Sequence, residues 1–243
     1  MLQAILFDFA NTLMHFGKFN RRKIFKSGSR DTYQHLKTLN IPLPPYSVYA
    51  RTNMRIFRRR YIWSNIRGRD FNATDVMVKV LKKLEIHVPE REHPTLAWMW
   101  YRPVVQQVKI EPGTHDMLEK FRRRGLRLAI VSNTCAPGHC LDRHLENEKL
   151  LEYFPVRIYS SHTLYRKPHP EIFRIALESL GVTPDQAMFV GDLIRADIKG
   201  ARRAGMLTVW KPVTHTAKYS RRNRPDHVIR KITELPKIIE SIT

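Results

Sequence analysis

Two aspartates that follow short apolar runs lie near opposite ends of this 243-residue chain. Asp8 follows residues 5–7, and Asp192 follows residues 187–191. Uninterrupted apolar runs of this kind are typical of strands buried in a parallel sheet. Ligands of open α/β sheets bind just beyond the carboxyl ends of the strands, so we expect both carboxylates in one crevice. There they would suit a hard cation, and Asp8 could also act as a nucleophile; otherwise each aspartate only caps the turn after its strand.

Two further segments supply groups that suit a phosphate. Residues 128–132 form another apolar run, which ends at Ser132 and is followed by Asn133. Lys167 stands immediately before a helix start that is marked by prolines. An ammonium and a hydroxyl bind phosphate oxygens, while carboxylates hold the cation that offsets the phosphate charge. Asp197, which follows the second apolar run closely, adds a further carboxylate.

This constellation resembles the haloacid dehalogenase-like (HAD) hydrolase superfamily, and the resemblance covers nearly the whole chain. Asp8 falls at the nucleophile of the first family motif, and Ser132 falls at the second motif. Lys167 falls at the third motif, and Asp192 and Asp197 fall at the acidic fourth motif. The resemblance implies a hydrolase, most simply a phosphatase that acts on a small phosphorylated metabolite through an aspartyl-phosphate and depends on Mg²⁺.

The resemblance also implies roles for individual residues. The residues expected to hold Mg²⁺ are Asp8, Ala10 through its backbone carbonyl, Asp192 and Asp197. The residues expected to bind the substrate are Thr12, Ser132, Asn133 and Lys167. The expected catalytic residues are Asp8, Ser132 and Lys167.

One position departs from the pattern of the phosphatases in this superfamily. They carry a second aspartate two residues after the nucleophile, as general acid and base, whereas this chain has Ala10 there. A methyl group cannot transfer a proton, and the loss of general acid–base catalysis typically costs about 10²–10⁴-fold in rate. Metal binding would survive, because the family uses only the backbone carbonyl of this residue.

Several explanations for Ala10 stay open. The substrate could have a good leaving group, such as an acyl phosphate, or His15 could supply the proton. The protein could also be a catalytically weakened relative that binds an anionic ligand or partner. We favour an enzyme, because a relic should lose Asp8, Lys167 and Asp192 as readily as the second aspartate.

A further explanation is that the reaction itself differs. Phosphonoacetaldehyde hydrolases of this superfamily carry alanine at this position, and their first motif resembles residues 8–12 with Phe16, Gly17 and Phe19 following. Such an enzyme would hydrolyse a C–P bond. It also needs a cap lysine in a local pattern with glycine and histidine, which we do not find in this sequence.

The chain is strongly basic. Lysine and arginine number 43 against 22 aspartates and glutamates, which gives a net charge of +21. This charge favours anionic partners, from phosphorylated metabolites to nucleic acid. Arginines cluster at 51–69, 122–124 and 221–224, in several elements rather than in one nucleic-acid-binding motif. We therefore interpret them as a solvated surface that steers small anions, and nucleic acid is not favoured as a partner.

Composition also limits location and redox chemistry. No apolar run reaches about 18 residues, so no membrane span is expected. We find no signal peptide and expect a cytoplasmic protein with reduced thiols. Cys135, Cys140 and His144 have a spacing that distantly resembles a zinc site, in a segment that we expect to be a loop.

The apolar periodicity divides the chain into two expected domains. Strand and helix patterns alternate over 2–8, 111–124, 128–132, 170–180, 187–191, 198–204, 226–229 and 235–239. This alternation predicts an α/β fold, a three-layer doubly wound parallel sheet of Rossmann-like type. We predict a core domain of residues 1–15 and 105–243 and an inserted α-helical cap domain of residues 16–104. Within the cap, helical spacing at 31–39 and 73–84 flanks a basic stretch, 54–63, whose aromatic face we interpret as cap core.

Overall fold

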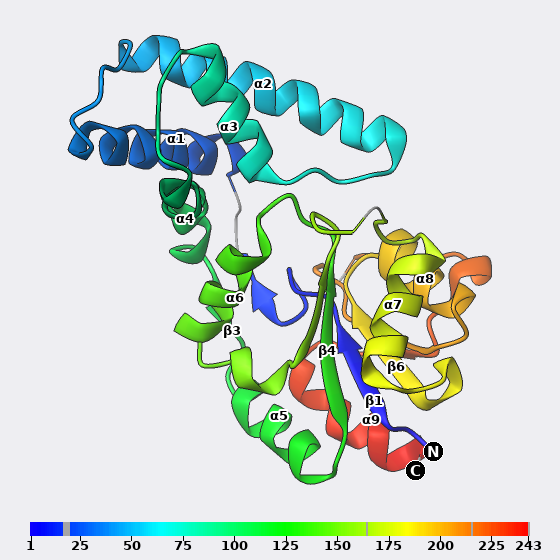
Figure 1. Ribbon diagram of the computed structural model, residues 1–243. Helices are drawn as coiled ribbons and strands as arrows, with labels where there is room; N and C mark the ends of the chain where they lie inside the picture. Colours follow the sequence, from blue (N-terminus) through cyan, green and yellow to red (C-terminus); the bar gives the residue numbers. More distant parts are fainter. Residues whose placement is uncertain (17–19, 164, 215, 243) are drawn as a thin grey trace.

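A computed structural model describes residues 1–16, 20–163, 165–214 and 216–242. A parallel six-stranded sheet lies between helices, and a group of four helices projects from one end of it (Figure 1). The strand order is β5-β4-β1-β6-β7-β8. The strands are β1 (Ala4–Phe7), β4 (Arg127–Ser132), β5 (Val156–Tyr159), β6 (Ala187–Gly191), β7 (Leu207–Trp210) and β8 (His227–Val228). Among the described residues, no helix is both long and apolar enough to cross a membrane.

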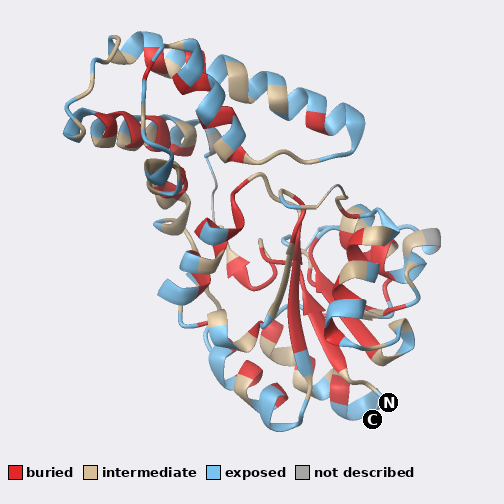
Figure 2. Ribbon diagram, in the orientation of Figure 1, coloured by how far each residue is buried: buried red, intermediate tan, exposed pale blue. Residues whose placement is uncertain are grey.

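Both faces of the sheet are covered, which explains why its strands are apolar throughout. Ile5 and Phe7 of β1 pack on the side of α5 (Thr114–Arg123), α6 (Gly138–Asn147) and α9 (Leu235–Ile242). Ala4 and Leu6 point the other way, toward α7 (Pro170–Leu180) and α8 (Lys199–Arg203). All four side chains are fully buried, and the central strands form the buried interior in Figure 2.

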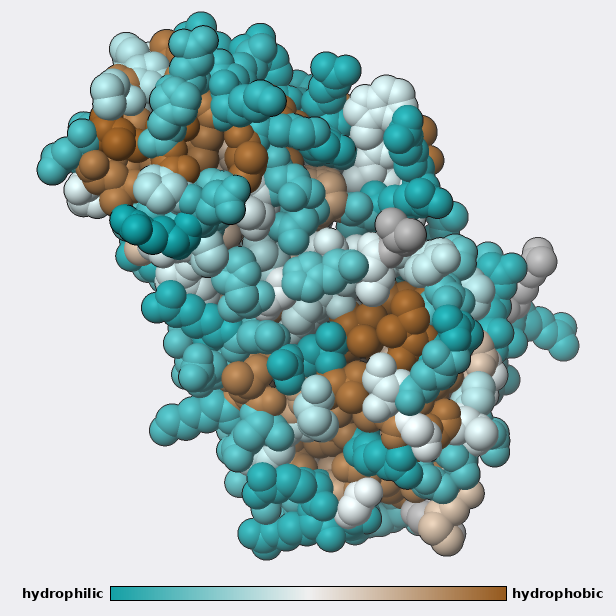
Figure 3. All heavy atoms as spheres, in the orientation of Figure 1, coloured by the Kyte–Doolittle hydropathy of each residue, from teal (hydrophilic) through white to brown (hydrophobic). Residues whose placement is uncertain are grey.

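The helical insertion comprises α1 (Arg21–Thr38), α2 (Tyr46–Arg67), α3 (Ala73–Lys83) and α4 (His93–Val105). Two short antiparallel strands, β2 (Met14–His15) and β3 (Lys109–Ile110), carry the chain out to these helices and back. Short 3₁₀ turns lie at Glu90–Glu92, Leu151–Tyr153, Pro184–Gln186, Arg221–Asn223 and Ile232–Glu234. Hydrophilic residues cover most of the face shown in Figure 3, and apolar residues gather over the insertion and over the sheet.

The insertion has an aromatic core that agrees only in part with the sequence interpretation. Phe57 of α2 packs against Phe25, Phe71 and Trp100, with ring centroids 5.1–5.5 Å apart. This part of the aromatic face is cap core, as predicted. Trp63, six residues later, is 47% exposed, so the same interpretation is wrong for that residue. Helical periodicity rotates it away from the face that Phe57 buries.

Polar and aromatic contacts hold the insertion against the sheet domain. Asp70, in the turn after α2, accepts a hydrogen bond from Ser160 at 2.5 Å and pairs with Arg166 at 3.2 Å. On the other side of the insertion, Tyr101 of α4 lies 2.9 Å from Nδ1 of His144 on α6. These contacts bring residues of the insertion next to α6 and to the loop that follows β5.

The predicted fold class, a doubly wound parallel sheet with a helical insertion, is confirmed. The predicted boundaries of the two domains remain predictions, and Gly17 and Phe19 lie outside the described residues. The expected loop around Cys140 and His144 is wrong, because these residues lie on α6. The helix expected over 111–124 begins only at Thr114, since Gly113 adopts φ 83° and interrupts the helical backbone.

Several other elements differ in extent or were not predicted. The strand expected over 2–8 is limited to Ala4–Phe7. The helix expected over 198–204 is preceded by a π-helical turn, Ile194–Ile198. Neither β5 nor β7 was predicted. Both are four residues long and one contains an arginine, so their apolar signal is weak.

Gly28 tests the close packing of α1 against α4. A Cβ at Gly28 would overlap the backbone carbonyl of Trp100. Alanine normally favours a helix over glycine by about 1 kcal/mol. Here we expect Gly28→Ala to lower the free energy of unfolding, because overpacking typically costs about 1–3 kcal/mol. Chemical denaturation measures the difference, with Ser27→Ala on the same helix as the control. A Gly28→Ala variant as stable as the wild type would contradict this packing.

Candidate active site

The predicted catalytic and metal-binding side chains lie together at the carboxyl edge of the sheet. Asp8 follows β1, Ser132 ends β4, and Asp192 follows β6. These three strands are neighbours in the sheet, so their ends converge although the residues are far apart in sequence. Lys167 joins them from the loop before α7. All four residues are at most 7% exposed.

Lys167 is the centre of this arrangement. Its Nζ donates to Asp8 Oδ1 at 2.6 Å and to the carbonyl of Val131 at 2.7 Å. The same ammonium lies 2.8 Å from Asp197 Oδ1. Its side chain is 1% exposed, so all three oxygens bind it away from bulk water. A buried charge is stable only when it is paired and hydrogen-bonded, and these partners satisfy that requirement.

Asp197 is held in place by the π-helical turn and by the glycine before Asp192. Asp197 Oδ2 accepts a hydrogen bond from the backbone amide of Leu193 at 2.8 Å. A Cβ on Gly191 would lie only 2.5 Å from Cβ and Cγ of Asp197. Glycine at position 191 therefore makes room for the carboxylate that pairs with Lys167. The sequence analysis did not assign Gly191 a role, although its position just before Asp192 was a usable signal.

Asp192 and the turn after β1 face the same region. Asn11 Nδ2 lies 3.4 Å from Asp192 Oδ2, and Trp210 Nε1 donates to the Asp192 carbonyl at 2.8 Å. Asn11 adopts φ 58°, and its backbone N–H donates to the Met14 carbonyl at 2.6 Å. Ala10 therefore lies in a tight turn between Asp8 and β2. The contact with Asp192 places the Asn11 side chain beside the carboxylates.

The expected substrate-binding residues lie around this centre in different ways. Ser132 is 3% exposed at the end of β4. Asn133 forms a reciprocal pair with the backbone of Lys167, accepting from its amide at 2.7 Å and donating to its carbonyl at 2.9 Å. Thr12 is fully buried, and its hydroxyl has no hydrogen-bond partner within the described part of the chain. Asn133 thus positions Lys167, and its expected contact with substrate remains a prediction.

The carboxylates are difficult to ionise together. Burial raises the pKa of Asp8 from 3.8 to about 6, and Lys167 only partly opposes this rise. Burial, with repulsion from Asp8 and Asp197, raises the pKa of Asp192 to about 8. Burial lowers the pKa of Lys167, but the attraction of Asp197 and Asp8 outweighs it and raises the pKa overall. The site therefore has more negative charge than Lys167 alone can neutralise.

This excess of negative charge fits a divalent cation. Within the described residues, Asp8, Asp192 and Asp197 form the only group of three or more His, Cys, Asp or Glu side chains placed to share a metal. Their oxygens lie within 4.8 Å of one another. Oxygen-only donors suit hard cations such as Mg²⁺. Among the same described residues, Cys135, Cys140 and His144 form no such group, and the two cysteines are not joined by a disulfide.

A second polar cluster lies next to the site and was missed by the sequence analysis. Lys211, at the end of β7, is 2% exposed. Its Nζ lies 3.0 Å from His15 Nε2, 3.4 Å from Glu111 Oε2 and 3.4 Å from the Asn11 carbonyl. Burial lowers the pKa of Lys211. The only sequence signal was a lysine directly after a short apolar run, and lysines in such positions are usually exposed.

The same cluster bears on His15, the alternative proton donor. His15 Nε2 also lies 3.0 Å from Glu111 Oε2, so this nitrogen is placed between a carboxylate and an ammonium. The histidine side chain is 41% exposed and lies on β2, one of the two connections to the helical insertion. Through His15 on β2 and Glu111 just after β3, both connections to the insertion contact Lys211 at the end of β7.

Comparison with known proteins agrees with this geometry. The family model described as haloacid dehalogenase-like hydrolase matches residues 70–211, which include Ser132, Lys167, Asp192 and Asp197. The chain belongs to this family. The resemblance inferred from the sequence motifs is thereby confirmed.

Several relatives of this HAD-family chain are named as phosphatases. It is 36% identical over 104 residues to the phosphoserine phosphatase of Thermus thermophilus, a match that covers 41% of this chain and 39% of the relative. It is 33% identical over 131 residues to the glyceraldehyde 3-phosphate phosphatase of Pyrococcus furiosus, covering 53% and 52%. N-acylneuraminate-9-phosphatase of Rattus norvegicus is 27% identical over 151 residues, covering 60% and 58%. The matches thus span between two fifths and three fifths of these relatives.

Solved structures share the whole fold. The 2-haloacid dehalogenase of Pseudomonas syringae has a TM-score of 0.69 at 20% identity, with both chains covered completely. A HAD phosphatase of Thermococcus onnurineus has a TM-score of 0.62 at 27% identity, with 98% of each chain covered. The first likeness shows the fold alone, because its sequence identity is low.

The raised pKa values predict how stability responds to pH and Mg²⁺. The pKa values of folded Asp8 and Asp192, about 6 and about 8, exceed the usual 3.8. Their contribution to metal-free stability is therefore complete below about pH 4 and is lost as the pH rises through about 6 and then about 8. Mg²⁺ needs deprotonated carboxylates, so its stabilising effect should grow over the same range. Thermal unfolding in Mg²⁺ and in EDTA, from about pH 5 to about pH 9, measures both trends.

Asp192→Asn is the matched variant for this experiment. Asparagine keeps the size of the side chain but cannot become charged, so the increase of Tm with Mg²⁺ should largely disappear. An equal effect of Mg²⁺ on the wild type and on Asp192→Asn would contradict the assignment of Asp192 to the metal. An effect of Mg²⁺ that is constant over the pH range would contradict the role of the raised pKa values.

Proposed function

We propose that this chain is a Mg²⁺-dependent phosphatase that acts on a small phosphorylated substrate through an aspartyl-phosphate on Asp8. The observation that carries the proposal is the buried ammonium of Lys167, which lies 2.6 Å from Asp8 and 2.8 Å from Asp197. A carboxylate held beside a fixed cation can meet an anionic phosphoryl group, because the cation offsets the repulsion. The three relatives described above are named as phosphatases, which supports the same reaction class.

In the proposed reaction, an oxygen of Asp8 forms a bond to phosphorus while the bond between phosphorus and the leaving oxygen breaks. Lys167 neutralises the negative charge of the phosphoryl oxygens, and the Ser132 hydroxyl donates a hydrogen bond to one of them. Water then attacks the phosphorus of the aspartyl-phosphate on Asp8. This step releases phosphate and restores the Asp8 carboxylate. Asn133 keeps the Lys167 backbone in place throughout.

Asp8, the Ala10 carbonyl and Asp192 would hold Mg²⁺, which would offset the charge of the carboxylates and of the phosphoryl group. Asp197 contacts Lys167 and the Leu193 amide, so we assign to it the positioning of the ammonium as well as a share of the metal site. The Thr12 hydroxyl is buried in the turn after Asp8 and has no hydrogen-bond partner among the described residues, so we propose that it contacts the substrate phosphate or the loop that binds it. We also propose residues 16–104 as a separate cap domain over this site.

Ala10 sets the class of substrate that we propose. No carboxylic acid stands two residues after Asp8 to protonate the leaving oxygen. Nε2 of His15 lies between Lys211 and Glu111. These contacts occupy the nitrogen, which disfavours His15 as the proton donor to the leaving oxygen. We therefore propose a substrate whose leaving group departs without a proton, such as an acyl phosphate.

The first functional prediction concerns Asp8. Asp8→Asn should lower turnover of acetyl phosphate at least about a thousandfold, because the amide is a poor nucleophile. Asp185→Asn makes the same chemical change at an exposed turn and should leave turnover unchanged. Beryllofluoride, a mimic of the aspartyl-phosphate, should bind the wild type in the presence of Mg²⁺ and fail to bind Asp8→Asn, as measured by ¹⁹F NMR. Near-normal turnover by Asp8→Asn would place the nucleophile elsewhere.

The second functional prediction concerns Ala10. Rates for a series of phosphate esters should depend steeply on the pKa of the leaving group, with acetyl and aryl phosphates hydrolysed much faster than alkyl phosphates. Ala10→Asp should raise alkyl phosphate turnover selectively, by up to about 10²–10⁴-fold, the usual range for an added general acid. Ala10→Asn, similar in size but unable to donate a carboxylic proton, serves as the control. A flat dependence on the leaving group would reveal another proton donor, and His15→Ala would then test the histidine.

A further inference from the structure

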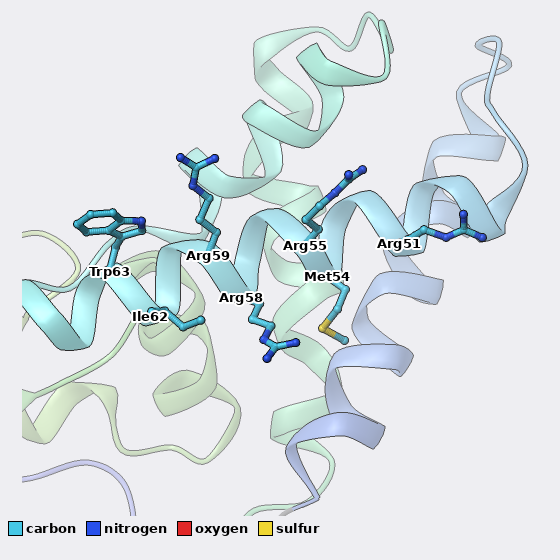
Figure 4. A pocket seen from close by; sticks show the side chains of 7 residues that line it. All are labelled: Arg51, Met54, Arg55, Arg58, Arg59, Ile62 and Trp63. Carbon is cyan, nitrogen blue, oxygen red and sulfur yellow. The ribbon is translucent and has the colours of Figure 1, made fainter.

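Two parallel rows of side chains run along the solvent face of α2. Residues four apart form such rows on a helix. The first row is basic and ends in an aromatic residue: Arg51, Arg55, Arg59 and Trp63. The second row is mostly apolar: Met54, Arg58, Ile62 and Ile66. All of these residues except Ile66 line an open groove of about 520 Å³. In Figure 4, Arg55, Arg59 and Trp63 stand on one side of α2, whereas Met54, Arg58 and Ile62 stand on the other.

The apolar side chains of this groove are unusually open to water. Met54 is 38% exposed, Ile62 46%, Trp63 47% and Ile66 71%. Clustered apolar residues on a surface are typical of a binding site, whereas single ones are ordinary. The Arg67 guanidinium lies 5.0 Å from the centroid of the Trp63 ring and adds a cation at this end of the groove.

The charge of α2 also lacks internal compensation. The helix carries six arginines and no aspartate or glutamate. Within the described residues, no carboxylate pairs with Arg51, Arg55, Arg58 or Arg59. The arginine cluster at 122–124 behaves differently. The three arginines of that cluster, Arg122, Arg123 and Arg124, pair with Glu119, Glu152 and Glu240. The interpretation of the arginines as a solvated charged surface therefore suits the cluster at 122–124, but it does not suit the arginines of α2.

We propose that the groove on α2 binds a single-stranded nucleic acid. The basic row is placed to contact successive phosphates, because side chains four apart are spaced by about 6 Å along the helix axis. Trp63 offers a ring on which a base can stack, and Met54 and Ile62 offer apolar contact for neighbouring bases. The pattern of separate phosphate-binding and base-binding rows is the combination that sequence-tolerant single-strand sites use. Composition alone favoured a solvated surface, and the alignment of these two rows revises that expectation.

Other anionic partners match the groove less well. A helix that lies on a membrane buries a continuous apolar stripe, whereas Arg58 interrupts the apolar row here and a basic row runs beside it. A duplex would offer phosphates to the basic row but would keep its bases stacked inside, away from Trp63. An acidic protein surface would pair with the arginines but would not need the exposed tryptophan.

Fluorescence anisotropy with the full chain tests the proposal. The probes are fluorescein-labelled DNA and RNA single strands of about twelve nucleotides, of mixed sequence, at about 0.15 M salt. We expect a Kd below about 1 μM for at least one of them, and weaker binding of the matching duplex. The triple variant Arg51→Gln, Arg55→Gln, Arg59→Gln should reduce the slope of log K against log salt by about 2, because each phosphate that an arginine neutralises contributes about 0.7 to that slope. Trp63→Ala should weaken binding about tenfold or more while leaving the slope unchanged.

A matched control separates the groove from net charge. The triple variant Arg122→Gln, Arg123→Gln, Arg124→Gln removes the same charge from the paired cluster and should leave affinity within about threefold. Circular dichroism confirms that each variant is folded. Equal losses in the two triple variants, no effect of Trp63→Ala, a wild-type Kd above about 10 μM, or preferential binding to vesicles containing phosphatidylserine or to an acidic peptide would each overturn the proposal.

Discussion

The whole site depends on one buried ammonium. Lys167 lies within hydrogen-bonding distance of Asp8, Asp197 and the Val131 carbonyl, and its side chain is almost completely removed from water. Removal of one partner from a buried ion pair typically costs about 3–5 kcal/mol, because the remaining charge is left uncompensated. Any change that moves Lys167 therefore destabilises the carboxylates. Any change that moves a carboxylate likewise leaves the Lys167 ammonium without a partner. The pairing with Asn133 and the space left by Gly191 are explained by this constraint.

The parallel sheet meets this constraint by bringing strand ends together. β1, β4 and β6 are adjacent, so Asp8, Ser132 and Asp192 arrive at one edge from positions up to 184 residues apart. Helices on both faces exclude water from the strands. The helical insertion then adds contacts from outside the sheet, since Asp70 bonds to Ser160 and Arg166 in the loops next to the site.

Charge is distributed unevenly over this protein. The net charge is +21, yet the cluster at the sheet edge contains three buried carboxylates, and burial raises the pKa of two of them. A basic exterior around an acidic cluster attracts anions by its long-range field, while the cluster itself needs cations before an anion can bind there. The arginines also differ from one another: those at 122–124 pair with glutamates, whereas within the described part of the chain those in the middle of α2 pair with no carboxylate.

The sequence by itself determined the fold class and the set of candidate residues. Apolar runs and helical spacing are local signals, and Asp8, Ser132, Lys167 and Asp192 follow or precede such runs directly; their roles as catalysts and ligands remain predictions. Tertiary structure alone decided which groups meet. The contact of Lys211 with His15 and Glu111, the pairing of Asn133 with the Lys167 backbone, and the exposure of Trp63 beside the burial of Phe57 all depend on packing between segments far apart in the chain. No local pattern encodes such contacts, because the same lysine, asparagine or tryptophan is equally compatible with an exposed surface until its neighbours are known.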